Sequence, residues 1–168
     1  MRKVSAGIVA YRFSEGGHIE VLLGHPGGPV WAHRDRGCWS IPKGEFDPLE
    51  ETPLDAARRE FAEETGYSVN GKFIELGSAR LKSGKEVYAF GLECSNLDAS
   101  QAHSNMFEME WPPHSGQHVS FPELDRIGWF GMAEALIKIL PGQQQFISEL
   151  KARLEAGGGE AEMRCGPA

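Results

Sequence analysis

The order of hydrophobic and polar positions divides this chain into strand-like and helix-like stretches. Residues 3–13 and 19–23 are short apolar runs with mixed alternation, and the Gly16-Gly17 pair between them is a hairpin signal. Similar runs recur further along the chain, so several strands are expected. The further strand candidates are residues 72–80, 86–93, 105–111 and 126–130.

Residues 53–65 carry the clearest helical pattern. Their apolar positions step by three and four, which places one buried stripe along a helix. Thr52 is a typical N-cap residue, Pro53 suits the first helical position, and Gly66 suits the left-handed position that ends a helix. Two later helices are expected at residues 132–140 and 143–154.

Strands on both sides of one helix, followed by two late helices, predict an α/β (α+β) fold with a mixed sheet flanked by helices. The 168 residues suit a single domain, which we place at residues 1–154. Residues 155–168 contain a Gly-Gly-Gly run without an apolar period, so a flexible C-terminal tail is expected there. No apolar run approaches the roughly 20 residues that cross a bilayer, so no membrane association is expected.

The composition narrows the classes of function. The chain is 40% hydrophobic and 24% charged, as in ordinary soluble proteins, and its formal net charge is −7. This acidic balance argues against an extended nucleic-acid footprint, which needs a basic face. The cysteines Cys38, Cys94 and Cys165 are far apart and lack metal-site spacing, so reduced thiols and a cytoplasmic location are expected.

The acidic excess is concentrated in one window. Residues 45–64 hold eight acids and two bases, a net charge of −6, which leaves −1 for the other 148 residues. Within this window Glu60, Glu63 and Glu64 are spaced three and four apart, so a helix places them on one face. Such a face is often merely solvated. It could also hold Mg²⁺ or Mn²⁺, because hard cations prefer carboxylate oxygens and bridge to phosphates.

The stretch from Gly44 to Tyr67 resembles the signature of the Nudix (MutT-like) hydrolases. Seven residues after Glu51 the chain reads Arg59-Glu60-Phe61-Ala62-Glu63-Glu64-Thr65-Gly66-Tyr67, which matches every fixed position of that half. One departure is the spacer of six residues between Gly44 and Glu51, where the family has five. The order of elements is also similar over about residues 1–154, which implies the family's α/β/α sandwich. The sequence of residues 39–45 is similar to that found in a bacterial branch of predicted nucleoside-triphosphate pyrophosphohydrolases.

The resemblance implies an enzyme that hydrolyses a nucleoside diphosphate linked to another group, using Mg²⁺ or Mn²⁺. Its partner is then a small nucleotide, with nucleoside triphosphates or a related nucleotide as the expected substrate. A dinucleoside polyphosphate, a nucleotide sugar and capped RNA are alternatives, and a catalytically silent nucleotide-sensing module is the alternative from another class. The substrate, the attacked phosphorus and the oligomeric state stay open.

The resemblance also assigns roles to the motif residues. Glu60 and Glu64 are expected to bind metal, and Glu63 to bind metal or take part in proton transfer. Arg59 is expected to orient Glu60 or to pair with Glu51, which supports the loop. The structural positions of the motif are Gly44, Glu51 and Gly66.

Further site residues are expected near the motif and outside it. The backbone carbonyl of Lys43 matches a frequent metal contact of the family, and the Lys43 side chain and Trp39 are candidate substrate contacts. Glu123 is the first candidate for an additional acid that binds metal or acts as general base, because its placement resembles that of some family members. Glu108 and Glu110 are the alternatives, two apart on one strand face.

Overall fold

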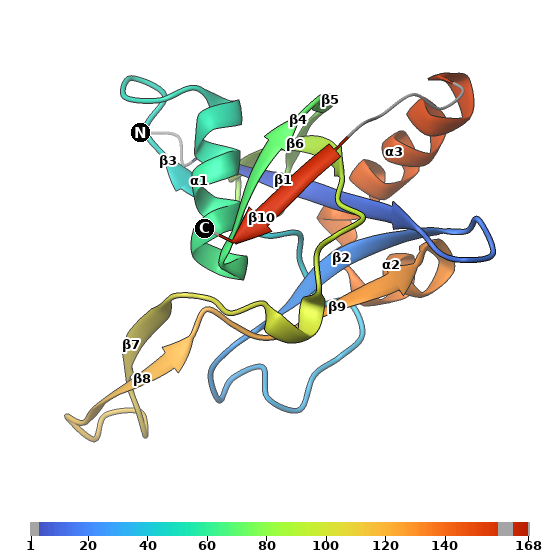
Figure 1. The fold of residues 1–168 in the computed structure, drawn as a ribbon. Coiled ribbons are helices and arrows are strands. Elements are labelled where there is room, and N and C mark those ends of the chain that lie inside the picture. Colours follow the sequence, from blue (N-terminus) through green and yellow to red (C-terminus); the bar gives the residue numbers. More distant parts are fainter. Residues whose placement is uncertain (1–3, 158–162, 168) are drawn as a thin grey trace.

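A mixed β-sheet lies between two layers of helices in the computed structural model, which describes residues 4–157 and 163–167 (Figure 1). Strand β1 (Val4–Phe13) is central and pairs parallel with β6 (Glu86–Glu93). One edge of β1 serves two antiparallel strands, since β3 (Lys43–Phe46) pairs with its first residues and β2 (Ile19–Pro26) with its last. The strand order is β5-β6-β1-β2-β9, with β3 attached to β1.

The other predicted elements follow the expected order with small shifts at their ends, and short strands that were not predicted lie among them. The expected strands at 72–80 and 126–130 begin at residues 74 and 124. The remaining bounds are β4 (Tyr67–Gly71), β5 (Ile74–Arg80), β7 (Met106–Glu110), β8 (His118–Pro122), β9 (Leu124–Gly131), β10 (Met163–Pro167), α1 (Pro53–Thr65), α2 (Met132–Lys138) and α3 (Gln144–Gly157), with single 3-10 turns at Ala99–Gln101 and Pro141–Gln143.

Helix α1 begins and ends as its caps predict. The Thr52 hydroxyl accepts a hydrogen bond from the Asp55 amide at 3.2 Å, and Gly66 closes the helix in the left-handed region at φ 78°. The helix buries one stripe against the first core, on one face of the sheet. This core includes Ala6, Ile8, Ala10, Leu22, Ala56, Ala57, Phe61, Val69, Phe90 and Leu92.

Helices α2 and α3 cover the opposite face of the sheet, which completes the expected α/β/α sandwich. The second core includes Val9, Tyr11, Val21, Leu23, Ala135, Phe146, Ile147 and Leu150. Among the described residues no helix is long and apolar enough to cross a membrane.

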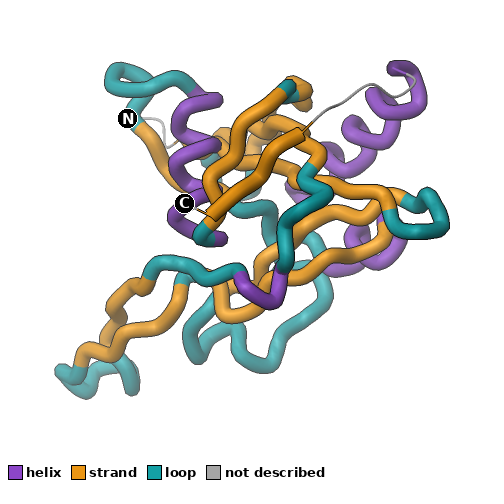
Figure 2. The backbone as a smooth tube through the Cα atoms, viewed as in Figure 1, coloured by secondary structure: helices purple, strands orange, loops and turns teal. Residues whose placement is uncertain are grey.

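The expected single strand at 105–111 is one half of a hairpin. Strands β7 and β8 pair only with each other and form a separate two-stranded sheet, which extends away from the main body (Figure 2). The second strand escaped prediction because residues 118–120 are exposed, so no buried face imposes an alternating pattern.

The segment beyond residue 154 contains more regular structure than the expected flexible tail. Residues 155–157 continue α3, and β10 pairs antiparallel with β4 from Met163↔Gly71 to Pro167↔Tyr67. Strand β10 reads Met-Arg-Cys-Gly-Pro, which has no alternation of apolar and polar residues, so the sequence pattern did not predict a strand there. Residues 158–162 and 168 of the expected tail, and residue 3 of the expected first strand, lie outside the described part of the chain.

Candidate active site

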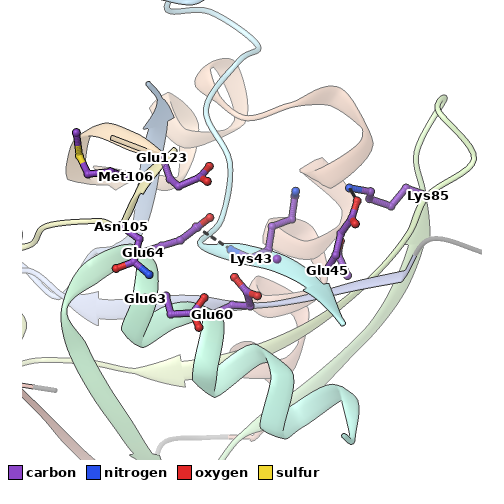
Figure 3. A pocket seen from close by; sticks show the side chains of 11 residues that line it. Lys43, Glu45, Glu60, Glu63, Glu64, Lys85, Asn105, Met106 and Glu123 are labelled. Atoms are coloured by element: carbon purple, nitrogen blue, oxygen red, sulfur yellow. Dashed lines mark hydrogen bonds and ion pairs between the residues drawn. The ribbon is translucent and has the colours of Figure 1, made fainter. Parts of the chain in front are cut away.

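A pocket of about 580 Å³ opens beside α1, where parts of the chain distant in sequence meet. Helix α1 and strand β3 form two of its walls, and the rest comes from Ser5 of β1 and from residues in or next to β6, β7 and β9. Figure 3 shows side chains from these elements turned toward one space. Six of the predicted site residues line it: Lys43, Gly44, Glu60, Glu63, Glu64 and Glu123.

Five carboxylates line this pocket. Three come from α1, Glu45 comes from β3, and Glu123 approaches from the turn between β8 and β9. The position of Glu123 is fixed by its backbone, since its amide donates to the Asn105 carbonyl at 2.8 Å and its carbonyl accepts from Gly27 at 2.9 Å. The alternatives Glu108 and Glu110 lie on β7 and do not line the pocket. The structure therefore brings together the motif acids and the first candidate outside the motif.

Gly44 allows strand β3 to pass close to helix α1. A Cβ atom at this position would collide with the carboxyl group of Glu60. The missing side chain therefore makes room for the Glu60 carboxylate at the wall of the pocket, as the motif predicts for this glycine.

Glu64 is the most perturbed acid of the pocket. Burial raises its pKa to about 8, and the nearby charges of Glu60 and Glu123 act in the same direction. The Lys43 amide opposes this shift by donating a hydrogen bond to Glu64 Oε2 at 3.0 Å. Burial also raises the pKa of Glu60, against the effect of Arg59. Burial thus disfavours the charged forms of both Glu60 and Glu64.

Arg59 performs both of the alternative roles expected of it. Its Nη2 donates to Glu51 Oε1 at 2.6 Å, and its Nη1 donates to Glu60 Oε1 at 2.6 Å. A weaker contact of 3.4 Å reaches the backbone carbonyl of Glu45 in β3. The guanidinium thus ties Glu51, in the loop before α1, to the helix and to the strand that borders the pocket.

The donor set of the pocket fits a hard divalent cation. Its carboxylate oxygens are the ligands that Mg²⁺ and Mn²⁺ prefer, and a cation would favour the charged forms of Glu60 and Glu64, whose pKa values burial raises. Among the described residues, however, no three acid, His or Cys side chains are arranged closely enough to hold a metal ion as they stand. Glu60 contacts Arg59, whose Nη1 lies 2.6 Å from Glu60 Oε1.

The structure corrects the expected substrate contact at Trp39. This side chain is only 4% exposed and lies in the core between the rings of His25 and Phe130. Its indole Nε1 donates to Asp35 Oδ1 at 2.8 Å, so its polar atom is already satisfied. A bulky aromatic residue in a loop gave no sequence signal to distinguish core from site.

Sequence reasoning passed over several residues that line the pocket. Lys85 was one of many scattered cations, and Asn105 and Met106 carried no motif at all. Ser5 could have been found, because it is a hydroxyl inside the otherwise apolar start of β1.

Comparison with protein families gives a match over most of the chain. Residues 1–150 match the model of a family described as NUDIX domain. A 17.7 kDa protein from the e-segB intergenic region of Enterobacteria phage T4 is 36% identical over 92 residues, which make up 54% of this chain and 58% of that protein. This chain thus spans little more than half the length of its phage relative.

Solved structures share the fold along nearly the whole chain. A binary complex of a C. elegans Ap4A hydrolase has a TM-score of 0.60 at 22% identity, covering 92% of this chain and 98% of that one. A mutT/nudix family protein from Listeria innocua has a TM-score of 0.63 at 18% identity, covering 92% and 94%. The NUDIX domain of Shewanella oneidensis NrtR, complexed with ADP ribose, has a TM-score of 0.60 at 15% identity, covering 92% and 89%. At these identities the likeness concerns the fold.

Proposed function

Because the chain belongs to the NUDIX domain family, we propose that it is a hydrolase that cleaves a nucleotide pyrophosphate bond at this pocket, with Mg²⁺ or Mn²⁺ as cofactor. The proposed substrate is a nucleoside triphosphate or a related nucleotide. The observation that carries the proposal is the convergence of the three motif acids with Glu123 on one pocket.

Glu60, Glu63 and Glu64 would hold the proposed cation, with the Lys43 carbonyl as a further ligand and Glu123 as either a ligand or the general base. When bound, it supplies positive charge that neutralises phosphate oxygens and lowers the barrier to attack by water. Arg59 keeps Glu60 within reach of the site while the cation is absent, because it holds that carboxylate at 2.6 Å. The Lys43 amide does the same for Glu64.

A proton acceptor for the attacking water is also required. Glu123 is our proposed general base, because it lines the pocket from the side opposite α1 and comes from a turn that backbone hydrogen bonds hold in place. The Lys43 side chain lines the same pocket and is proposed to contact the phosphates of the substrate.

A screen of nucleotides with and without Mg²⁺ or Mn²⁺ tests this function. The panel contains nucleoside triphosphates, dinucleoside polyphosphates and nucleotide sugars, and the products are identified by chromatography and ³¹P NMR. We expect metal-dependent release of a phosphate-bearing product, which Glu64→Gln and Glu123→Gln each lower by at least about a hundredfold. Glu50→Gln is the matched control, since Glu50 is an exposed acid of the same window that does not line the pocket.

Two outcomes would contradict the proposal. Turnover that persists in Glu64→Gln would remove this residue from the metal site. Binding of a nucleotide without turnover of any panel member, in the presence of either metal, would favour a nucleotide-sensing module.

A further inference from the structure

Ser5 is a buried hydroxyl without a partner at the edge of the candidate active site. Its side chain is 0% exposed, and Ser5 Oγ has no hydrogen-bond partner in the described part of the chain. A buried hydroxyl normally makes at least one hydrogen bond, and leaving it unpaired costs free energy. Because Ser5 also lines the pocket, a bound molecule is the missing partner that the geometry allows.

The strand register places Ser5 on the basic side of the pocket. Ser5 pairs directly with Glu45 of β3, so these two side chains share one face of the sheet. Lys43, two residues before Glu45, lies on that face too, whereas Gly44 between them faces Glu60. Ser5, Lys43 and Glu45 therefore lie on the face of β3 opposite the Glu60 carboxylate.

Two ammonium groups accompany the Ser5 hydroxyl. Lys85, just before β6, reaches Glu45 Oε1 with its Nζ at 2.6 Å, and its side chain is 23% exposed. The Lys43 stem lies across Gly7, where an added Cβ would come within 2.6 Å of Lys43 Cβ. In Figure 3, Glu45 and Lys85 lie at one end of the pocket and Glu64 and Glu123 at the other, with Lys43 between them. Glu45 and the two ammonium groups thus lie in the same pocket as the Ser5 hydroxyl.

We propose that Ser5, Lys43 and Lys85 bind a phosphate oxyanion of the substrate, on the face of β3 opposite the Glu60 carboxylate. A phosphate oxygen can accept from the Ser5 hydroxyl and from both ammonium groups, which gives the unpaired hydroxyl its hydrogen bond. This subsite rests on the proposed function, because it adds a second contact for a substrate whose other phosphate lies among the acids. Ser5 is its specificity-determining residue.

Binding of a non-hydrolysable anion tests the subsite separately from turnover. Methylenediphosphonate is titrated into the protein with Mg²⁺ by calorimetry, and KM and kcat are measured with the best nucleotide of the panel. We expect Ser5→Ala to weaken methylenediphosphonate binding about tenfold and to raise KM by a similar factor, with kcat nearly unchanged. Lys85→Gln is the second variant, with the same expected direction.

Lys82→Gln is the matched control, because Lys82 is an exposed lysine of the same β5–β6 loop that does not line the pocket. Its affinity and KM should equal those of the wild type. The melting temperature of Ser5→Ala should be equal to or above that of the wild type, since the unpaired hydroxyl is gone.

The possible results separate this inference from the proposed function. Equal affinity and equal KM in Ser5→Ala, with normal nucleotide turnover, would overturn the subsite and leave the hydrolase intact. Ser5-dependent binding of methylenediphosphonate without turnover of any nucleotide would support the subsite while the proposed function fails. Failure of the wild type to bind methylenediphosphonate at all would also overturn the subsite.

Discussion

Glu64 is a residue at which folding and the proposed chemistry make opposite demands. Its pKa rises from an ordinary 4.5 to about 8 on folding, chiefly through burial, so the folded protein binds a proton there that the unfolded chain releases. Stability therefore falls as pH rises from about 4.5 and reaches its lower level above about pH 8. In the proposed metal complex, the cation would replace this proton on Glu64.

Glu64→Gln should stabilise the metal-free protein in a pH-dependent way. Glutamine can still accept from the Lys43 amide but cannot ionise, so the penalty for a buried charge disappears. With EDTA present, the melting temperature of the variant should exceed that of the wild type at pH 8.5, and the difference should shrink toward pH 5. Thermal unfolding at both pH values measures it, and a difference independent of pH would contradict the assigned shift.

Residue spacing predicted the acids but not their surroundings. The separation of Glu60, Glu63 and Glu64 by three and four positions is a local property of a helix, so the sequence contains it. The exposure of Trp39 and the missing partner of Ser5 depend on segments far away in the chain, which no local pattern records.

At the scale of elements, the close contact between strand β3 and helix α1 determines the shape of the pocket. The two approach so closely at Gly44 that a methyl group there would meet the Glu60 carboxylate. Gly44→Ala should therefore move Glu60 or push β3 from the helix, lowering turnover by at least about tenfold and stability by about 1–3 kcal/mol. Nucleotide turnover and urea unfolding measure the two effects.

Gly131→Ala is the control for this substitution, because an added Cβ at Gly131 meets no atom within 4 Å. It should leave turnover unchanged. A Gly44→Ala variant with wild-type turnover would show that β3 and Glu60 can separate without loss of function.

Elements with their own buried stripe were predictable, and elements made by pairing were not. The caps and the apolar stripe of helix α1 predicted it from the sequence, and the structure confirms both. Strand β3 reads Lys-Gly-Glu-Phe, which has little strand propensity, and exists because it pairs with β1. The same reason applies to β10, whose partner β4 precedes it by about a hundred residues.

At the scale of the whole molecule, the proposed cation site should make the stability of the folded state depend on divalent metal. Mg²⁺ at about a hundred times its dissociation constant should stabilise the protein by about 2.7 kcal/mol, since the unfolded chain lacks the assembled site. For a chain of this size we expect the melting temperature to rise by roughly 5–10 °C. Differential scanning fluorimetry with Mg²⁺ and then EDTA measures the rise and its reversal.

Glu64→Gln serves as the comparison in this titration, and its melting temperature should respond much less to Mg²⁺. An equal rise in both proteins would assign the stabilisation to general screening of the acidic window rather than to this site.

The position of β1 between β6 and the β2/β3 edge has a consequence for how the molecule is made. β1 and β6 pair from Val4↔Glu86 to Tyr11↔Glu93, so about ninety residues must leave the ribosome before the central strand gains its whole parallel neighbour. Until then a nascent chain can form the hairpin of β1 and β2 and the helix that follows, but the edge of β1 that later pairs with β6 is bare. The pocket is completed later still, because its walls include Glu123. Activity at this pocket during synthesis would therefore report the arrival of Glu123, after the central strand is paired.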